Sequence, residues 1–168
     1  MRKQLAVFLL IASVFVWGIW CGGQIFNELM VVPIWSASPP ESLKAYRQLP
    51  SIGGGLFFPV VSTLFLLLAV ISAIAAWKSA RRARKWLALS AGTAVLLLVV
   101  LVSYLAPLVM SMFQHSVAGD LPAAEIIAGV ERWKFGNRIR LIVECVGFVF
   151  SIIALRVWSI ESAIEENL

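Results

Sequence analysis

An arginine and a glutamate inside one apolar stretch are the first candidates for chemistry. Arg140 and Glu144 lie four residues apart near the start of an apolar stretch, residues 139–158. That spacing places both side chains on one face of a helix, where they can form an ion pair. Charged groups are costly inside a bilayer and usually mark a site or a structural ion pair. We therefore treat Arg140 and Glu144 as candidate catalytic residues, with a structural ion pair as the alternative.

A second set of polar and aromatic side chains lies in the first apolar stretch. Spacings of three and four residues place them on one helix face. The set comprises Trp17, Trp20, Gln24, Asn27 and Glu28. Gln24 lies about 28 Å along a helix from Leu5, at about 1.5 Å per residue, so this face reaches the far boundary of the bilayer. The sequence predicts that it meets the face of Arg140 and Glu144 there and forms an outward-facing polar pocket.

Further residues extend the predicted pocket. Asn137 lies on the face of Arg140, Trp133 lies one turn before it, and the third apolar stretch contributes Tyr104 and His115. Simpler interpretations remain open. Glu28 can be an interfacial charge that reaches water along its stem, His115 can be a solvated loop residue, and Trp133 can be an interfacial anchor.

Four apolar stretches must position these groups. Hydrophobic residues make up 61% of the 168 and charged residues only 14%, against about 45–50% and about 25% in soluble domains. A spanning helix needs about 20 mainly apolar residues. The predicted spans are residues 5–32, 56–77, 86–113 and 139–158. We expect one all-α domain over residues 1–168, an antiparallel bundle of four transmembrane helices.

Basic residues indicate the orientation of that bundle. The short connection at residues 78–85 contains Lys78, Arg81, Arg82, Arg84 and Lys85. Compact basic loops stay on the cytoplasmic side, so this loop indicates topology rather than nucleic-acid binding. We expect both termini to be cytoplasmic, in a cell (inner or plasma) membrane.

The outer loops are then expected at residues 33–55 and 114–138. Pro39 and Pro40 predict a short surface helix over Glu41–Leu49. Asp120 and Pro122 predict a helix start, after which a helical pattern runs toward the fourth span. Gly129 and Gly136 are candidate kinks in that helix.

Several kinds of chemistry are disfavoured. Cys21 and Cys145 form no CxxC motif, which argues against a thiol oxidoreductase; we expect two free thiols, with a bond between them as the alternative. One histidine excludes a bis-histidine haem site and a multi-histidine metal site. We expect no metal and no cofactor.

One motif carries a resemblance to a known family. The segment Trp133-Lys-Phe-Gly-Asn137-Arg-Ile-Arg140 resembles the Trp-x-x-x-Asn/His-x-x-Arg signature of the anthrone oxygenase-like membrane proteins. The segment from Gly22 to Asn27, followed by Pro33, resembles the end of that family's first helix. The four-span plan and the length also agree.

The resemblance implies an activity and roles for residues. Characterised members oxidise anthrones with molecular oxygen and no known cofactor, and Trp133, Asn137 and Arg140 would be pocket residues. Leu141 stands where the family often has threonine, and Asn137 stands where many members have histidine. The general base would then be Glu144, Glu28 or His115, and Arg140 would stabilise the oxyanion.

Two other functions remain open. A binding or transport accessory protein would exchange a cationic amphiphile against a proton at Glu144 or Glu28. A structural subunit would pack against a partner through the motif Gly18-x-x-x-Gly22. Expected partners are membrane lipid and a hydrophobic small molecule, not nucleic acid, and a homo-oligomer is left open.

Overall fold

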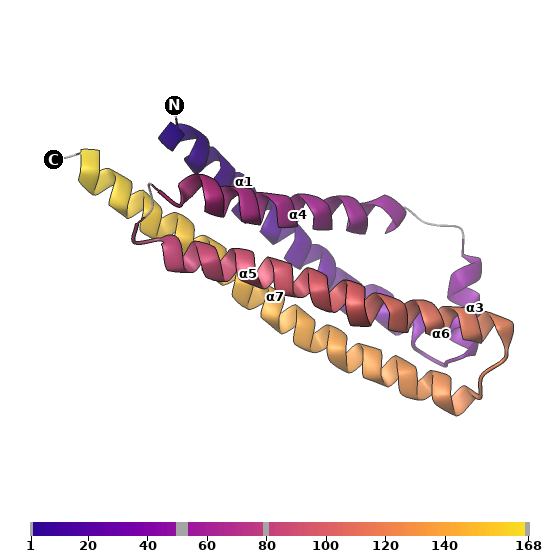
Figure 1. Cartoon of the computed structure of the whole chain (residues 1–168). Helices are drawn as coiled ribbons and strands as arrows, with labels where there is room; N and C mark the ends of the chain where they lie inside the picture. The colour runs from indigo at the N-terminus through magenta and orange to yellow at the C-terminus, as the bar shows by residue number, and fades with distance from the viewer. Residues whose placement is uncertain (1, 50–53, 79–80, 167–168) are drawn as a thin grey trace.

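The protein is all-α over the residues that its computed structural model describes, which are 2–49, 54–78 and 81–166. Four of its helices are long and apolar enough to cross a membrane. They form an antiparallel bundle, and α3 lies across one end of it (Figure 1). The predicted fold class is therefore confirmed.

The first long helix contains one widened turn. It consists of α1 (Arg2–Phe26), the π-helical turn η1 (Asn27–Val31) and α2 (Val32–Trp35), which follow one another without a break. The N–H of Val32 donates to the carbonyl of Asn27 in the five-residue π pattern. Pro33 follows at once, and its ring has no N–H and crowds the preceding turn of a regular helix. A π turn accommodates such a residue within a continuous helix.

The third long helix repeats this solution. It consists of α5 (Arg84–Val100), the π-helical turn η2 (Leu101–Leu105) and α6 (Ala106–Ala118), with Pro107 just after the wide turn. The helix ends at Gly119, whose φ of +69° is left-handed and whose N–H donates to the carbonyl of His115. Glycine adopts this conformation without the strain of a side chain.

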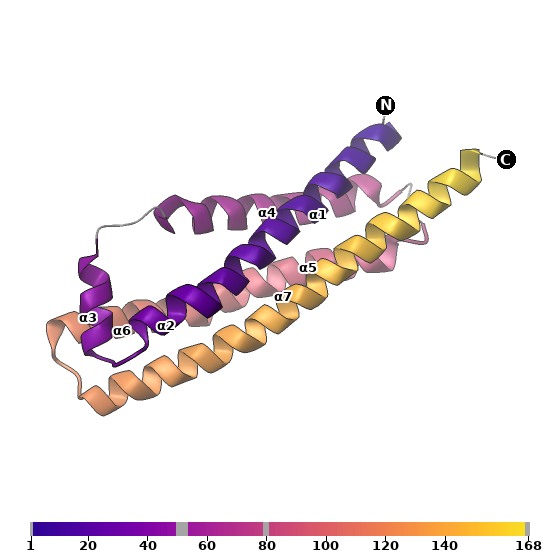
Figure 2. The same cartoon turned by 180° about the vertical axis from the view of Figure 1, so that it is seen from behind.

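The other two long helices differ greatly in length. α4 (Gly54–Ala76) has 23 residues, whereas α7 (Ala123–Glu166) has 44. In cross-section α4 contacts α1, α1 contacts α7, α7 contacts α5, and α5 contacts α4, which closes a ring. At the end near α3 (Glu41–Gln48), α4 is absent, and α3 fills its place between α2 and α6 (Figures 1 and 2).

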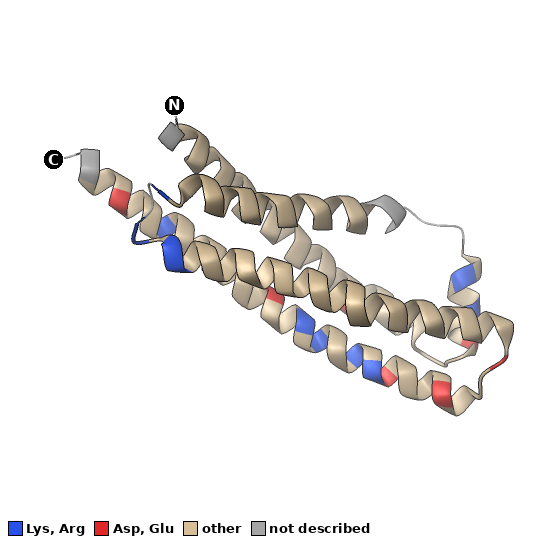
Figure 3. Ribbon diagram, viewed as in Figure 1, with Lys and Arg blue, Asp and Glu red and all other residues tan. Residues whose placement is uncertain are grey.

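Both ends of the described chain lie at one end of the bundle. The start of α1, the end of α7 and the connection between α4 and α5 lie together there, opposite α3 (Figures 1 and 2). Basic residues of the connection mark this end in Figure 3. We call it the basic end, and the opposite end the α3 end.

The helices extend beyond the predicted spans. The first helix continues to Trp35, the third runs from Arg84 to Ala118, and α7 starts at Ala123. The predicted loops 33–55 and 114–138 therefore begin or end inside helices, because polar residues on a packed helix face do not end the helix. The short helix after Pro40 is confirmed as α3, and the helix start after Pro122 is confirmed as α7.

Gly129 and Gly136 serve packing, and α7 continues as an α-helix through both. A Cβ atom at Gly129 would lie 3.0 Å from the sulfur of Met112, and one at Gly136 would lie 3.1 Å from Leu105. The missing side chains let α7 approach α6 and η2 closely.

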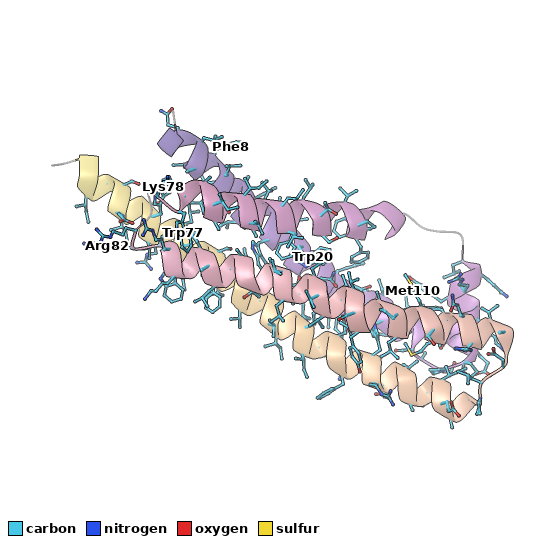
Figure 4. All side chains as sticks on the ribbon, viewed as in Figure 1. Phe8, Trp20, Trp77, Lys78, Arg82 and Met110 are labelled. Carbon is cyan, nitrogen blue, oxygen red and sulfur yellow. The ribbon has the colours of Figure 1, made fainter. Side chains whose placement is uncertain are left out.

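Large apolar side chains cover the outside of the bundle. Phe8 is 67% exposed and Met110 is 62% exposed, whereas Trp20 is buried between the helices (Figure 4). Large apolar side chains on the outside of a helix bundle are expected where the surroundings are lipid rather than water.

Candidate functional site

The packing of α1 against α7 sets the geometry of the candidate site. Gln24 contacts Arg140 and Glu28 contacts Asn137. Gly18 lies against the ring of Phe148. Because the helices are antiparallel, residue numbers rise on α1 as they fall on α7. Polar residues that the sequence places on two separate faces therefore meet in one interface.

Arg140 is the centre of a hydrogen-bonded network. It is 5% exposed, and its Nη2 donates to Oε1 of Gln24 at 2.6 Å and to Oδ1 of Asn137 at 2.9 Å. Its Nε also donates to Oδ1 of Asn137, at 3.2 Å. These bonds engage Nε and Nη2 of the buried guanidinium and hold its plane in a fixed orientation.

Glu28 connects the network to the surface. Its Oε2 accepts from Nδ2 of Asn137 at 2.8 Å, and its Oε1 accepts from Nε of Arg138 at 2.9 Å. The side chain of Arg138 is 64% exposed, whereas that of Glu28 is 11% exposed. Glu28 is thus a largely buried interhelical partner that contacts one exposed arginine.

Glu144 is the exception in this network. It is 0% exposed, and neither carboxylate oxygen has a hydrogen-bond partner. Nη1 of Arg140 lies 3.6 Å from its Oε2, which is an ion pair beyond hydrogen-bond reach. The thiol of Cys21, a weak donor, lies beside it on α1. We call Gln24, Glu28, Asn137, Arg138, Arg140 and Glu144 the polar cluster.

Trp17 and Trp20 pack next to the polar cluster, toward the basic end. Trp17 meets Phe65 of α4 edge-on at 4.2 Å, and Trp20 stacks on the same ring at 5.9 Å. Trp17 is 0% exposed, and its indole N–H also has no hydrogen-bond partner. A Cβ atom at Gly147 would lie 2.6 Å from the ring of Trp17, so this glycine makes room for it.

An apolar groove lies on the outer surface beside the polar cluster. Its volume is about 450 Å³ and it is open to the surroundings of the bundle. It is lined by Ile25, Leu141, Ile142, Cys145, Val146 and Val149. Leu141 and Cys145 follow Arg140 and Glu144 directly in the chain, whereas the two charged side chains are buried and do not line the groove.

The other predicted pocket residues lie elsewhere. Trp133 donates to the carbonyl of Leu105 at 3.1 Å and packs edge-on against Trp35 at 5.0 Å, in an aromatic cluster at the α3 end. Tyr104 is 45% exposed on η2. Asn27 is half-buried in η1, where its carbonyl accepts the π-type bond from Val32.

His115 stabilises a turn and is distant from the polar cluster. It belongs to the last turn of α6, and its Nδ1 lies 2.8 Å from Oδ1 of Asp120. This hydrogen bond lowers the pKa of Asp120 below its usual value. His115 lies beside Asp120, just before α7 begins at Ala123. Ala123 and Glu144 are separated by about 31 Å along α7, at about 1.5 Å per residue. His115 is therefore too distant to act as a base at Glu144 and Arg140.

Neither cysteine is bonded, and the described residues contain no cluster of metal ligands. Cys21 is buried and Cys145 is half-buried, both as free thiols. No group of three or more His, Cys, Asp or Glu side chains suited to a metal ion occurs among residues 2–49, 54–78 and 81–166.

No protein-family model, no curated protein and no solved structure matches the chain. The site must therefore be interpreted from its own geometry.

Some members and contacts of the polar cluster were predicted from the sequence, and others were not. Residue type and helical spacing together predicted five of the six members of the polar cluster. The sixth member, Arg138, was not predicted as part of the site. Spacing places Cys21 on the predicted face, four residues after Trp17 and three before Gln24, but does not by itself place it beside Glu144. That contact follows from the register between α1 and α7, which is a property of tertiary packing.

Proposed function

We propose that the protein binds a hydrophobic small molecule that enters from the bilayer and is held at Arg140 and Glu144. The observation that carries the proposal is the Glu144 carboxylate, which is fully buried and has no hydrogen-bond partner. Nearly all buried polar groups in native proteins are paired, and an unpaired one inside a membrane segment is a candidate site.

The groove supports lateral access from lipid. Its lining is apolar and includes Leu141 and Cys145, the chain neighbours of Arg140 and Glu144. A ligand with an apolar body and one hydroxyl group matches both parts. The body would occupy the groove, and the hydroxyl would donate to the Glu144 carboxylate, beside which lies the weakly donating thiol of Cys21.

The reaction that we propose follows the resemblance to the anthrone oxygenase-like proteins. Glu144 would remove a proton from the activated carbon of an anthrone, and Arg140 would stabilise the resulting oxyanion. The carbanion would then react with oxygen, which gives an anthraquinone and water. Among the three bases considered, Glu144 fits best because Glu28 is bonded to Asn137 and Arg138, and His115 is distant.

We also propose that the basic end faces the cytoplasm of a cell that carries the protein in its inner or plasma membrane. The support is the basic connection at the same end as both chain ends (Figures 1 and 3).

Native mass spectrometry of the protein in mild detergent tests the binding proposal. We expect a co-purified small molecule in the wild type that Glu144→Gln loses and Ser151→Ala keeps. Ser151 is buried on the same helix but donates to its own helix at Phe148, so it is a matched control. Phospholipid alone, retained equally by all three proteins, would contradict the proposal.

Oxygen uptake with an added anthrone tests the reaction separately. We expect consumption by the wild type and Ser151→Ala, and at least a hundredfold loss in Arg140→Ala, in line with removal of an oxyanion donor. If the protein binds the anthrone but consumes no oxygen, the binding proposal stands and the oxygenase proposal is wrong.

A further inference from the structure

The two cysteines lie at one level of the α1–α7 interface. Three contacts define the register: Gln24 with Arg140, Gly18 with Phe148, and the close approach of Trp17 to Gly147. Cys21 lies midway between Gly18 and Gln24 on α1. The matching positions on α7 are Glu144 and Cys145, midway between Phe148 and Arg140.

The surroundings of the two thiols agree with that register. Cys21 belongs to a buried apolar cluster between α1, α4 and α5, and the partly buried Cys145 of α7 packs against that cluster. Cys145 and Glu144 are both polar neighbours of the Cys21 sulfur. No other cysteine occurs in the chain, so each thiol has only this one intramolecular partner.

Access differs between the two thiols. Cys21 is buried at 5% exposure, whereas Cys145 lines the open apolar groove. A hydrophobic oxidant dissolved in the bilayer can reach Cys145 through this groove, but a charged oxidant in water cannot enter an apolar lining without losing its hydration.

From this placement we propose that Cys21 and Cys145 are an oxidation site, at which a lipid-soluble quinone converts the two thiols into a disulfide between α1 and α7. The step is balanced: the two S–H bonds break, one S–S bond forms, and the quinone takes two electrons and two protons to become the quinol. The bond would tie the helices together next to Glu144 and the groove.

The test uses the full-length protein in detergent micelles or lipid vesicles, with decylubiquinone as the oxidant. Peptide mapping should find a bond between Cys21 and Cys145, intact mass should fall by about 2 Da, and a maleimide should then label no thiol. Cys21→Ser and Cys145→Ser should each keep one free thiol and form no internal bond.

A relocated thiol is the matched control. Ile19 lies at nearly the same depth as Cys21 but about 200° around the helix, and it is 41% exposed. The double variant Cys21→Ser with Ile19→Cys should retain two reactive thiols after the same treatment. If it cross-links as fast as the wild type, the register carries no specificity and the proposal is wrong.

Other outcomes in the wild type would also overturn it. Disulfide-linked dimers without the internal bond would show that the thiols face different molecules. A stable adduct between the quinone and Cys145, with Cys21 still free, would show that the two sulfurs do not meet. Unchanged melting temperatures of the serine variants establish that each result comes from a folded protein.

Discussion

At the scale of single residues, the buried charges are the feature with the largest energetic consequences. Arg140 and Glu144 are both almost wholly buried and face one another across 3.6 Å. Removal of one partner leaves an uncompensated charge, whereas replacement of both by apolar groups of similar volume is often nearly neutral. This asymmetry separates a structural ion pair from a site that is kept for binding.

We predict that Arg140→Met lowers the free energy of unfolding by about 3–5 kcal/mol. The double variant Arg140→Met with Glu144→Met should recover most of that loss while it abolishes ligand binding. Thermal unfolding in one detergent measures the first effect, and native mass spectrometry the second. A double variant that is as unstable as the single variant would indicate that Gln24 and Asn137 require the guanidinium for their own pairing.

Two glycines offer a matched pair of substitutions. At Gly147 a new Cβ atom would lie 2.6 Å from Trp17 and 2.7 Å from Thr93, whereas at Gly22 nothing lies within 4 Å. We predict that Gly147→Ala destabilises the bundle by about 1–3 kcal/mol through overpacking. Gly22→Ala should leave stability unchanged or raise it by up to about 1 kcal/mol, since alanine favours the helix. Equal melting temperatures for both variants would contradict the described packing of Trp17.

Most members of the polar cluster could be predicted from residue type and helical spacing, whereas their contacts could not. Polar groups in apolar stretches predicted Gln24, Glu28, Arg140 and Glu144, because hydrocarbon selects strongly against such residues without a role, and helical spacing from Arg140 added Asn137. The bonds among them depend on side-chain rotamers and on helix register. Spacing therefore predicted a pocket lined by these groups, whereas the groove beside them is lined by apolar side chains.

At the scale of elements, the turn between α6 and α7 depends on pH. His115 holds the pKa of the exposed Asp120 carboxylate below its usual value through their hydrogen bond. A carboxylate with a lowered pKa in the folded state contributes stability above its unfolded pKa, and the contribution is lost as the pH falls through the folded value. The turn is thus most stable above about pH 4.

We predict that the carboxyl carbon of Asp120 titrates with a midpoint below the value of about 3.9 found in model peptides. His115→Gln should move the midpoint upward, because the ring that bonds the carboxylate is gone. Carbon-13 NMR of aspartate-labelled protein measures both values. Identical midpoints in the two proteins would show that the bond does not persist in solution.

Helix boundaries were predicted less well than helix existence. Hydropathy located all four long helices. A segment that crosses lipid must be apolar and must pair its backbone N–H and C=O groups within a helix. Hydropathy ended the helices too early, because α6 and the first half of α7 carry polar residues and still continue as helices that pack on each other, while α2 and α6 also pack on α3. The π turns before Pro33 and Pro107 arise from backbone geometry, and hydropathy contains no signal for them.

At the scale of the whole molecule, topology is the property most open to direct test. The ends of the described chain and the basic connection share one end of the bundle (Figure 2), and the orientation that we propose places that end in the cytoplasm.

We predict that single cysteines at Ser38 and Asp120, in a background without Cys21 and Cys145, react with a membrane-impermeant maleimide added to intact cells. A cysteine at Arg81 should react only after the cells are lysed. All three positions are exposed on the folded protein, so a difference in labelling reports the side of the membrane. The reverse pattern would invert the proposed orientation.

The shortness of α4 determines which bilayer suits this protein. The apolar part of α4, Phe57–Ala76, spans about 30 Å at about 1.5 Å per residue, which equals the thickness of an average hydrocarbon layer. The segments Gln4–Trp35 and Ala123–Ile164 are 32 and 42 residues long. A thicker, sterol-rich layer would cover more of these long helices. It would also bring the chain segments that flank α4 into hydrocarbon. The shortest of the four long helices therefore sets the hydrophobic thickness, and reconstitution should succeed best in lipids whose hydrocarbon layer is about 30 Å thick, and less well in thicker layers.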